Sequence, residues 1–199
     1  MLSRMRSIIL VNKWLATDTW SQVDMGPPDM TALAINTGRG KVLLNNMYND
    51  SGQQQGLEQS IQAFQKRSCV GGPEGHVEKT IWLGDFNLHH PLWDKACNGH
   101  LFTRSNLEKS QALIDALAEF NSQMALPKDI PTLQALSTGN HMRTDNVFVS
   151  SLIVSRVIRC TMQLDERTAI SDHILVVMEV NLLLEEWVKP LHPNFRSAD

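Results

Sequence analysis

The sequence predicts an α/β domain in which mixed β-sheets are layered with a small number of helices. Apolar runs of strand length recur throughout the 199 residues, and some are separated by only a short turn. Only two segments place their apolar residues at helical spacing. Hairpin-linked strands interrupted by two helices are typical of this class.

The first third of the chain reads as strands and turns. Residues 7–11 (Ser-Ile-Ile-Leu-Val) predict a buried strand, although it begins close to residue 1. Residues 31–36 and 41–48 predict two further strands, which flank the hairpin-type connection Thr-Gly-Arg-Gly at residues 37–40. Residues 25–29 (Met-Gly-Pro-Pro-Asp) predict a turn before them.

A first helix is expected over residues 57–67, where Leu57, Ile61 and Phe64 recur at helical spacing. The glycine-rich residues 70–75 predict a loop, and residues 80–83 (Thr-Ile-Trp-Leu) predict the next strand.

The second helix carries the clearest pattern. Ser105 and Glu108, three residues apart, form a capping box that predicts its start. One apolar stripe then follows, made of Leu107, Leu113, Ile114, Leu117 and Phe120. Its end is predicted by two prolines that follow apolar residues, in Leu126-Pro127 and Ile130-Pro131.

Three strands are expected in the last third, over residues 146–149, around 153–160, and over 174–184. We therefore expect one domain over residues 1–188 and a linker or tail over residues 189–199.

Composition excludes several classes of protein. Hydrophobic residues make up 42% and charged residues 20%, which is a globular mixture rather than that of a disordered chain or a coiled coil. Three scattered cysteines favour a reducing, intracellular compartment. No run approaches the roughly 18 apolar residues of a membrane span. The formal net charge of −3 disfavours a globally basic nucleic-acid binder. The net charge does not exclude a local basic rim, for which the candidate residues are Arg104, Lys109, Arg143, Arg156 and Arg159.

The strongest chemical signal is Gly84-Asp85-Phe86-Asn87, which directly follows an apolar strand. Side chains alternate in an extended chain, so Asp85 and Asn87 are expected to face one way while Phe86 anchors in the core. The structural alternative is an ordinary turn, because Gly, Asp and Asn are common turn residues.

A second signal is Ser171-Asp172-His173, just before the last apolar run. A carboxylate and an imidazole at the mouth of a strand can bind metal and move protons. Three adjacent residues cannot form a Ser-His-Asp triad. The structural alternative is a turn with an exposed histidine.

Two weaker signals complete the set. Asp145 stands at the start of an apolar strand, and Tyr48, the only tyrosine, stands at the end of another. The Tyr48 phenol could donate a hydrogen bond to a phosphate. Read alone, each has a structural explanation: a turn at the strand entry for Asp145, and a ring that bridges core and surface for Tyr48.

The order of these motifs resembles the endonuclease/exonuclease/phosphatase superfamily of metal-dependent phosphodiesterases. Within it, the chain is most similar to the endonuclease domains of non-LTR retrotransposons, of the reverse-transcriptase-associated fungal type. The resemblance covers nearly the whole chain and is carried by LGDFNLHHPLW at 83–93, Leu-Pro at 126–127, Pro-Thr-Leu at 131–133, TDNVFV at 144–149 and SDH at 171–173.

The resemblance implies a role for each catalytic residue. Asp85 would activate or position the attacking water, and Asn87 would hold the scissile phosphate. His173 would stabilise or protonate the phosphoryl group in the transition state, and Asp145 would orient that histidine. Tyr48 would contact the substrate phosphate. Phosphodiester hydrolysis needs charge neutralisation and a positioned nucleophile, which this set can supply.

The resemblance also implies a metal and partners. Asp172 and Asp85 would hold Mg²⁺, with Mn²⁺ as an alternative ion, because oxygen ligands suit these hard cations. The substrate would be DNA and a reverse transcriptase domain a partner, with no membrane and no small-molecule cofactor. Action on genomic DNA would imply a nuclear location.

Members of the superfamily open with a strand carrying an Asn and a strand carrying a metal-binding Glu. This chain starts at what resembles the following strand, so we expect a missing metal ligand, weakened activity and an exposed sheet edge. The alternative is an inactive remnant that acts at most as a nucleic-acid or protein binding module.

The residue types allow two other functions. His89, His90, Cys97 and His100 are suitable zinc ligands in type, but their spacing matches no standard structural site. A phosphoinositide or sphingolipid substrate would keep the fold, yet no anchor or basic amphipathic stretch supports it.

Overall fold

The computed structural model describes residues 5–52, 55–70, 79–163 and 171–183. Its centre is a six-stranded sheet in the order β1-β2-β3-β4-β8-β5. The strands of this sheet are β1 (Trp20–Val23), β2 (Met30–Thr37), β3 (Gly40–Tyr48), β4 (Lys79–Asp85), β8 (Asp145–Ser150) and β5 (Ser122–Met124). Only β3 and β4 pair in parallel within this sheet, and helix α1 (Gln55–Val70) stands between them in the sequence. A parallel pair requires such a crossover, whereas the antiparallel pairs do not.

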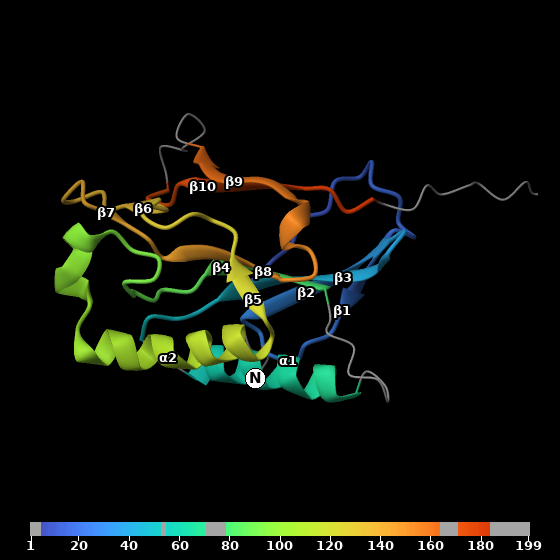
Figure 1. Cartoon of the computed structure of the whole chain (residues 1–199), viewed down its shortest axis with the longest axis horizontal. Helices are drawn as coiled ribbons and strands as arrows, with labels where there is room; N and C mark the ends of the chain where they lie inside the picture. Colours follow the sequence, from blue (N-terminus) through green and yellow to red (C-terminus); the bar gives the residue numbers. More distant parts are fainter. Residues whose placement is uncertain (1–4, 53–54, 71–78, 164–170, 184–199) are drawn as a thin grey trace, which may run out of the picture.

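The molecule has three layers (Figure 1). Helices α1 and α2 (Arg104–Glu119) cover one face of the central sheet, and the antiparallel pair β9 (Val157–Gln163) and β10 (Leu175–Val180) lies over the other. The small antiparallel pair β6 (Leu133–Gln134) and β7 (His141–Met142) lies at one end of the molecule, beside the β9–β10 layer in Figure 1. The remaining elements are the short 3₁₀ helices η1 (Ala96–Leu101) and η2 (Val154–Arg156). This architecture confirms the predicted α/β class with mixed sheets. No helix among the described residues is long and apolar enough to cross a membrane.

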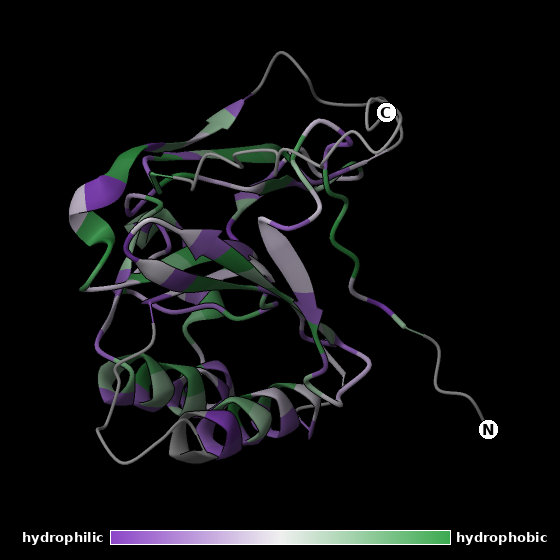
Figure 2. Ribbon diagram, turned by 90° about the vertical axis from the view of Figure 1, so that its right-hand side faces the viewer, coloured by the Kyte–Doolittle hydropathy of each residue, from purple (hydrophilic) through white to green (hydrophobic). Residues whose placement is uncertain are grey.

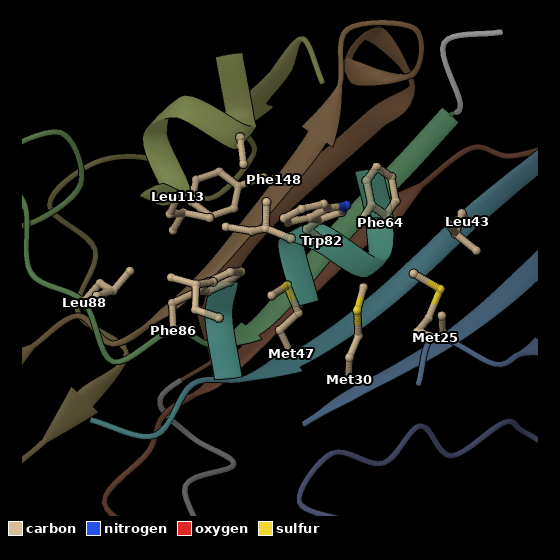
Figure 3. Close-up of a cluster of buried hydrophobic side chains, with 14 of the residues drawn as sticks. Met25, Met30, Leu43, Met47, Phe64, Trp82, Phe86, Leu88, Leu113 and Phe148 are labelled. Carbon is tan, nitrogen blue, oxygen red and sulfur yellow. The ribbon is translucent and has the colours of Figure 1, made fainter. Parts of the chain in front are cut away.

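The alternation of β-strand side chains gives the sheet two apolar faces. On the helix side, Trp82 of β4 packs against Phe64 of α1, with ring centroids 4.8 Å apart, among the side chains drawn in Figure 3. On the other side, Ile81 and Val147 belong to a second cluster that packs against residues of β9 and β10. Successive residues of β4 therefore face different layers, which decides where Asp85 points.

The hairpin of β2 and β3, the first helix and the strand over residues 80–83 are confirmed. The predicted strand over residues 7–11 is wrong. This segment has no strand partner among the described residues, and its Ile8 and Leu10 are 71% and 86% exposed. Side chains hold it instead: Thr31 donates to the Ser7 carbonyl, and Asn46 donates to the Ile8 carbonyl. Its hydrophobic stretch is the green trace that runs along the outside of the molecule toward the N-terminus in Figure 2.

The start of the second helix also differs from the prediction. Its N-cap is Thr103, whose side chain accepts a hydrogen bond from the Asn106 amide, so Ser105 is already inside the first turn. Glu108 pairs with Arg104 instead of closing a capping box. The helix stops at Glu119, well before the prolines, because Asn121 adopts a left-handed φ of 47°.

The last third is more broken than predicted. The last strand is shorter than expected, ending at Val180, and the run around residues 153–160 divides into η2 and β9. Strands β1, β5, β6 and β7 are short and were not predicted. The proposed tail at 189–199 and most of the loop at 70–75 lie outside the described residues.

Candidate active site

Three polar side chains from neighbouring strands meet at one end of the central sheet. Asp85 ends β4, Asp145 begins β8, and the two are direct partners in the antiparallel register. Tyr48 ends β3 and is the partner of Asp85 in the parallel register. Partnered residues share a face of the sheet, so all three point toward the β9–β10 layer.

The close approach of β3 and β4 at this end depends on Gly84. Its φ is +136°, in a region that side chains rarely adopt, and a Cβ atom placed there would lie 1.9 Å from the Met47 carbonyl oxygen. Glycine is therefore required directly before Asp85, which explains the first residue of the Gly-Asp-Phe-Asn motif.

The loop after β4 fixes the Asp85 carboxylate. The Asn87 backbone amide lies 3.2 Å from Oδ1 of Asp85, and its side-chain amide lies 2.9 Å from Oδ2. The same side-chain amide donates to the Asn49 carbonyl at 2.7 Å. Phe86 is fully buried, as predicted, in the helix-side core. Asn87 thus orients Asp85 in this structure, and its amide nitrogen is occupied by two acceptors.

Asn49 extends the pairing of β3 and β4 beyond the strands. Its backbone amide donates to the Asp85 carbonyl at 2.8 Å, and its side-chain amide donates to the Phe86 carbonyl at 2.7 Å. No role for Asn49 could be predicted from the sequence, since an asparagine after a strand resembles any turn residue.

A histidine from a distant segment completes the cluster. His173 Nδ1 lies 2.9 Å from Asp145 Oδ2, and His173 Nε2 lies 4.0 Å from Asp85 Oδ2. The hydrogen bond that His173 donates to the Asp145 carboxylate raises the pKa of His173 to about 9, against the effect of burial. Burial, followed by the nearby charge of Asp145, raises the pKa of Asp85. The imidazole is therefore charged near neutral pH and faces the carboxylate across a short gap.

Thr132 links the two segments that carry this pair. Its buried hydroxyl accepts hydrogen bonds from the backbone amides of Thr144 at 3.1 Å and Asp145 at 2.9 Å. Its carbonyl accepts from the Ile174 amide at 2.7 Å. Thr132 is part of the motifs that carry the family resemblance, but its role could not be predicted from the sequence, because it depends on contacts that only the fold creates.

Arg143 is buried beneath the site and is not part of a basic rim, which corrects the prediction for this residue. It is 1% exposed. Its guanidinium donates to the Asn146 side chain and to the backbone carbonyls of Leu126, Pro127 and Trp93. Burial lowers the pKa of Arg143 to about 10. The residue ties the start of β8 to the loops around residues 93 and 127.

Asp172 lies beside His173 and contributes to the raised pKa of that residue. Its backbone carbonyl accepts a hydrogen bond from the Gln134 amide. In the part of the chain that the structure describes, no three His, Cys, Asp or Glu side chains gather as a metal site. The carboxylates of Asp85 and Asp172 have the oxygen donors that Mg²⁺ prefers, and Mg²⁺ usually takes only one or two carboxylates plus water and substrate phosphate. Their chemistry therefore fits a metal that the substrate helps to hold.

Two of the four candidate zinc ligands, His89 and His90, have other partners. His89 Nδ1 lies 3.3 Å from the buried carboxylate of Asp94. His90 Nδ1 accepts a hydrogen bond from the Leu92 amide, and Cys97 is exposed. This arrangement gives a folded loop, not a zinc site.

An apolar groove of about 720 Å³ opens beside the cluster, between the central sheet and β10. Leu44 and Leu83 line it on one side, and Val176 and Met178 on the other, with His173 at its end. Within the described residues β10 pairs with β9 alone.

The sequence matches a family model described as "Endonuclease-reverse transcriptase" over residues 42–177, which is more than half of the chain. A comparison with curated proteins finds no match. The matched range includes the strands that carry Asp85 and Asp145.

Solved structures with a similar fold include three nucleases. The endonuclease domain of TRAS1, a telomere-specific non-LTR retrotransposon, has a TM-score of 0.63 and 18% identity, over 84% of this chain and 71% of that one. A 3′-5′ exonuclease (NExo) from Neisseria meningitidis has a TM-score of 0.56 and 15% identity, over 75% and 64%. The AP endonuclease LMAP from Leishmania major has a TM-score of 0.57 and 14% identity, over 76% and 54%. The chain thus spans less than two thirds of the last two structures, and at these identities the similarity concerns the fold.

Proposed function

Because the chain belongs to the endonuclease–reverse transcriptase family, we propose that it is a divalent-metal-dependent endonuclease that nicks DNA, of the retrotransposon type. The observation that carries the proposal is the arrangement of three side chains. Asp145 holds His173, and the free nitrogen of His173 faces Asp85 at 4.0 Å. Residues from three separate segments converge here, a grouping that a set of unrelated turns would not produce.

The proposed reaction is the hydrolysis of one phosphodiester bond. A water oxygen forms a new bond to phosphorus, the bond from phosphorus to the leaving sugar oxygen breaks, and one proton passes in total from the water to the leaving group. Asp85 is suited to position that water and accept its proton, because burial raises the pKa of its carboxyl. His173, charged at neutral pH, stabilises the phosphoryl oxygens or gives them a proton.

Asn87 and Tyr48 are the proposed contacts to the substrate phosphate. Tyr48 stands next to Asp85 in the strand register, which supports this role for its hydroxyl. The Asn87 amide already donates to Asp85 and Asn49, so a phosphate would have to replace one of these acceptors.

Asp85 and Asp172 are the residues that would hold Mg²⁺ or Mn²⁺. When bound, the metal would neutralise charge on the nonbridging phosphate oxygens. Two carboxylates make a weak site when no substrate is present, so we expect millimolar metal to be required and activity to be low.

DNA is the proposed substrate, and the family description supports association with a reverse transcriptase domain. With a net charge of −3, the affinity for DNA should be modest and should fall steeply as salt rises. If the target is genomic, the protein would act in the nucleus.

Nicking of supercoiled plasmid DNA tests the proposal. The purified chain should convert the plasmid to the open circle with Mg²⁺, and neither EDTA-treated protein nor Asp85→Ala should do so. If the folded wild-type chain gives no more open circle than these controls, the active-enzyme proposal fails and the alternative stands, an inactive remnant that acts at most as a nucleic-acid or protein binding module.

A further inference from the structure

We propose that Arg6 is a positioning residue for Tyr48, held against the phenol ring by the carboxylates of Asp29 and Asp50. The inference rests on the proposed function, in which the Tyr48 hydroxyl contacts the substrate phosphate. Arg6 lies in the N-terminal segment, far in sequence from the motifs that carry Asp85, Asp145 and His173, and the fold brings it to Tyr48.

The guanidinium of Arg6 is held on two sides. Its Nε and Nη2 donate to the two oxygens of Asp29, each at 2.6 Å, and its Nη1 donates to Asp50 at 2.5 Å. The guanidinium carbon lies 5.1 Å from the centre of the Tyr48 ring, within the range of a cation–π contact. A planar group anchored at three nitrogens has little freedom to leave that ring.

The anchors belong to the loops that flank Tyr48. Asp29 precedes β2, its side chain is only 5% exposed, and its carbonyl accepts the backbone amide of Tyr48 at 2.9 Å. Asp50 follows β3 and accepts a hydrogen bond from the Gly52 amide. The Arg6 amide itself donates to the Pro28 carbonyl. Arg6 therefore joins the N-terminal segment to both loops around the end of β3.

Charge argues against direct contact between Arg6 and the substrate phosphate. Two carboxylates surround one guanidinium, so the group as a whole carries a negative charge and does not attract an anion. Three of the five N–H donors are also in use. The Tyr48 hydroxyl, by contrast, makes no hydrogen bond within the described residues, which leaves it available to a ligand. Arg6 thus acts through the ring.

A double-mutant cycle with Tyr48→Phe tests this role. Removal of the cation in Arg6→Gln should lower the plasmid nicking rate about fivefold, the worth of an exposed cation–π contact. In the Tyr48→Phe background the same change should have no further effect, because the hydroxyl it positions is gone. Equal losses in both backgrounds would overturn the proposal and assign Arg6 a purely structural role. Lys13→Gln, which removes a cation from the exposed part of the same segment, is the matched control and should keep the wild-type rate.

Tyr48 is the only tyrosine of the chain, so a tyrosine-selective isotope label gives one NMR reporter that needs no activity. Arg6→Gln should shift the Tyr48 ring signals and narrow them through added mobility, while Lys13→Gln should leave them unchanged. Asp50→Asn is a milder variant, because it keeps the ion pair between Arg6 and Asp29 and is therefore less prone to unfold. It should shift the Tyr48 ring signals in the same direction as Arg6→Gln, but by less. Unchanged signals in a folded Arg6→Gln protein would refute the proposal. If the wild-type chain does not nick DNA, the proposed function fails while this measurement still decides the contact.

Discussion

His173 Nδ1 lies 2.9 Å from Asp145 Oδ2, and this contact turns the other ring nitrogen of His173 toward Asp85. The two residues come from segments 28 positions apart, and the buried Thr132 links their backbones. The pair is partly exposed, with 38% of the His173 side chain and 22% of the Asp145 side chain accessible, so a phosphate can reach it.

The Asp145–His173 contact predicts a pH dependence. His173 carries a pKa raised to about 9, so its charged form is present at neutral pH and is lost as pH rises through about 9. Nicking should therefore decline above that pH. In Asp145→Asn the largest cause of the raised pKa is gone, so the decline should move toward the ordinary value of about 6.5. A pH–rate profile of both proteins measures this.

The same contact affects folding stability. A pKa raised in the folded state gives stability that is complete below the unfolded pKa and is lost as pH rises through the folded one. The wild-type Tm should thus lose the contribution of this pair between about pH 6.5 and 9. Asp145→Asn should lack that part of the decline. Identical pH profiles of Tm for the two proteins would contradict the assignment.

Gly84→Ala should destabilise the protein by about 3 kcal/mol or more, because φ is unfavourable and the added Cβ meets backbone atoms of β3 that cannot move aside. Urea denaturation measures the free energy of unfolding. Gly99→Ala is the matched control, since its Cβ would meet nothing within 4 Å, and it should be close to neutral. Wild-type stability in Gly84→Ala would show that the β3–β4 approach is looser than described.

Thr132→Val should cost about 1–3 kcal/mol, because the amides of Thr144 and Asp145 lose their acceptor while the side-chain shape is kept. Nicking should fall as well, since Asp145 is then less well fixed. Thr132→Ser retains the hydroxyl and should recover most of both losses. If valine and serine variants behave alike, the hydroxyl does not hold the site together.

Much of the fold was readable from the sequence. The Gly-Asp-Phe-Asn motif indicated a strand end with a buried Phe86, and the β2–β3 hairpin and both helices were found. These features depend on local periodicity and turn chemistry, which single sequences carry. The resemblance to the superfamily is confirmed by the family match and the similar nuclease folds.

The errors have tertiary causes. Residues 7–11 have strand composition, but no described strand pairs with their backbone, which side chains of β2 and β3 hold instead. Arginine is a residue type that usually lies at the surface. Arg143 is buried instead, and hydrogen bonds to four oxygen acceptors compensate the cost of removing its charge from water. Arg6 and Thr132 act through residues more than ten positions away in sequence. No residue spacing within the sequence predicts contacts between such distant positions.

The nicking rate of His173→Ala, measured beside the wild-type chain on supercoiled DNA at neutral pH with Mg²⁺, tests the central claim most directly. Loss of a group that stabilises or protonates the phosphoryl oxygens predicts a fall of about 10²- to 10⁴-fold, with circular dichroism showing an intact fold. A wild-type chain that nicks DNA and a folded His173→Ala variant that nicks it equally fast would contradict the claim that the His173–Asp145–Asp85 cluster performs the hydrolysis.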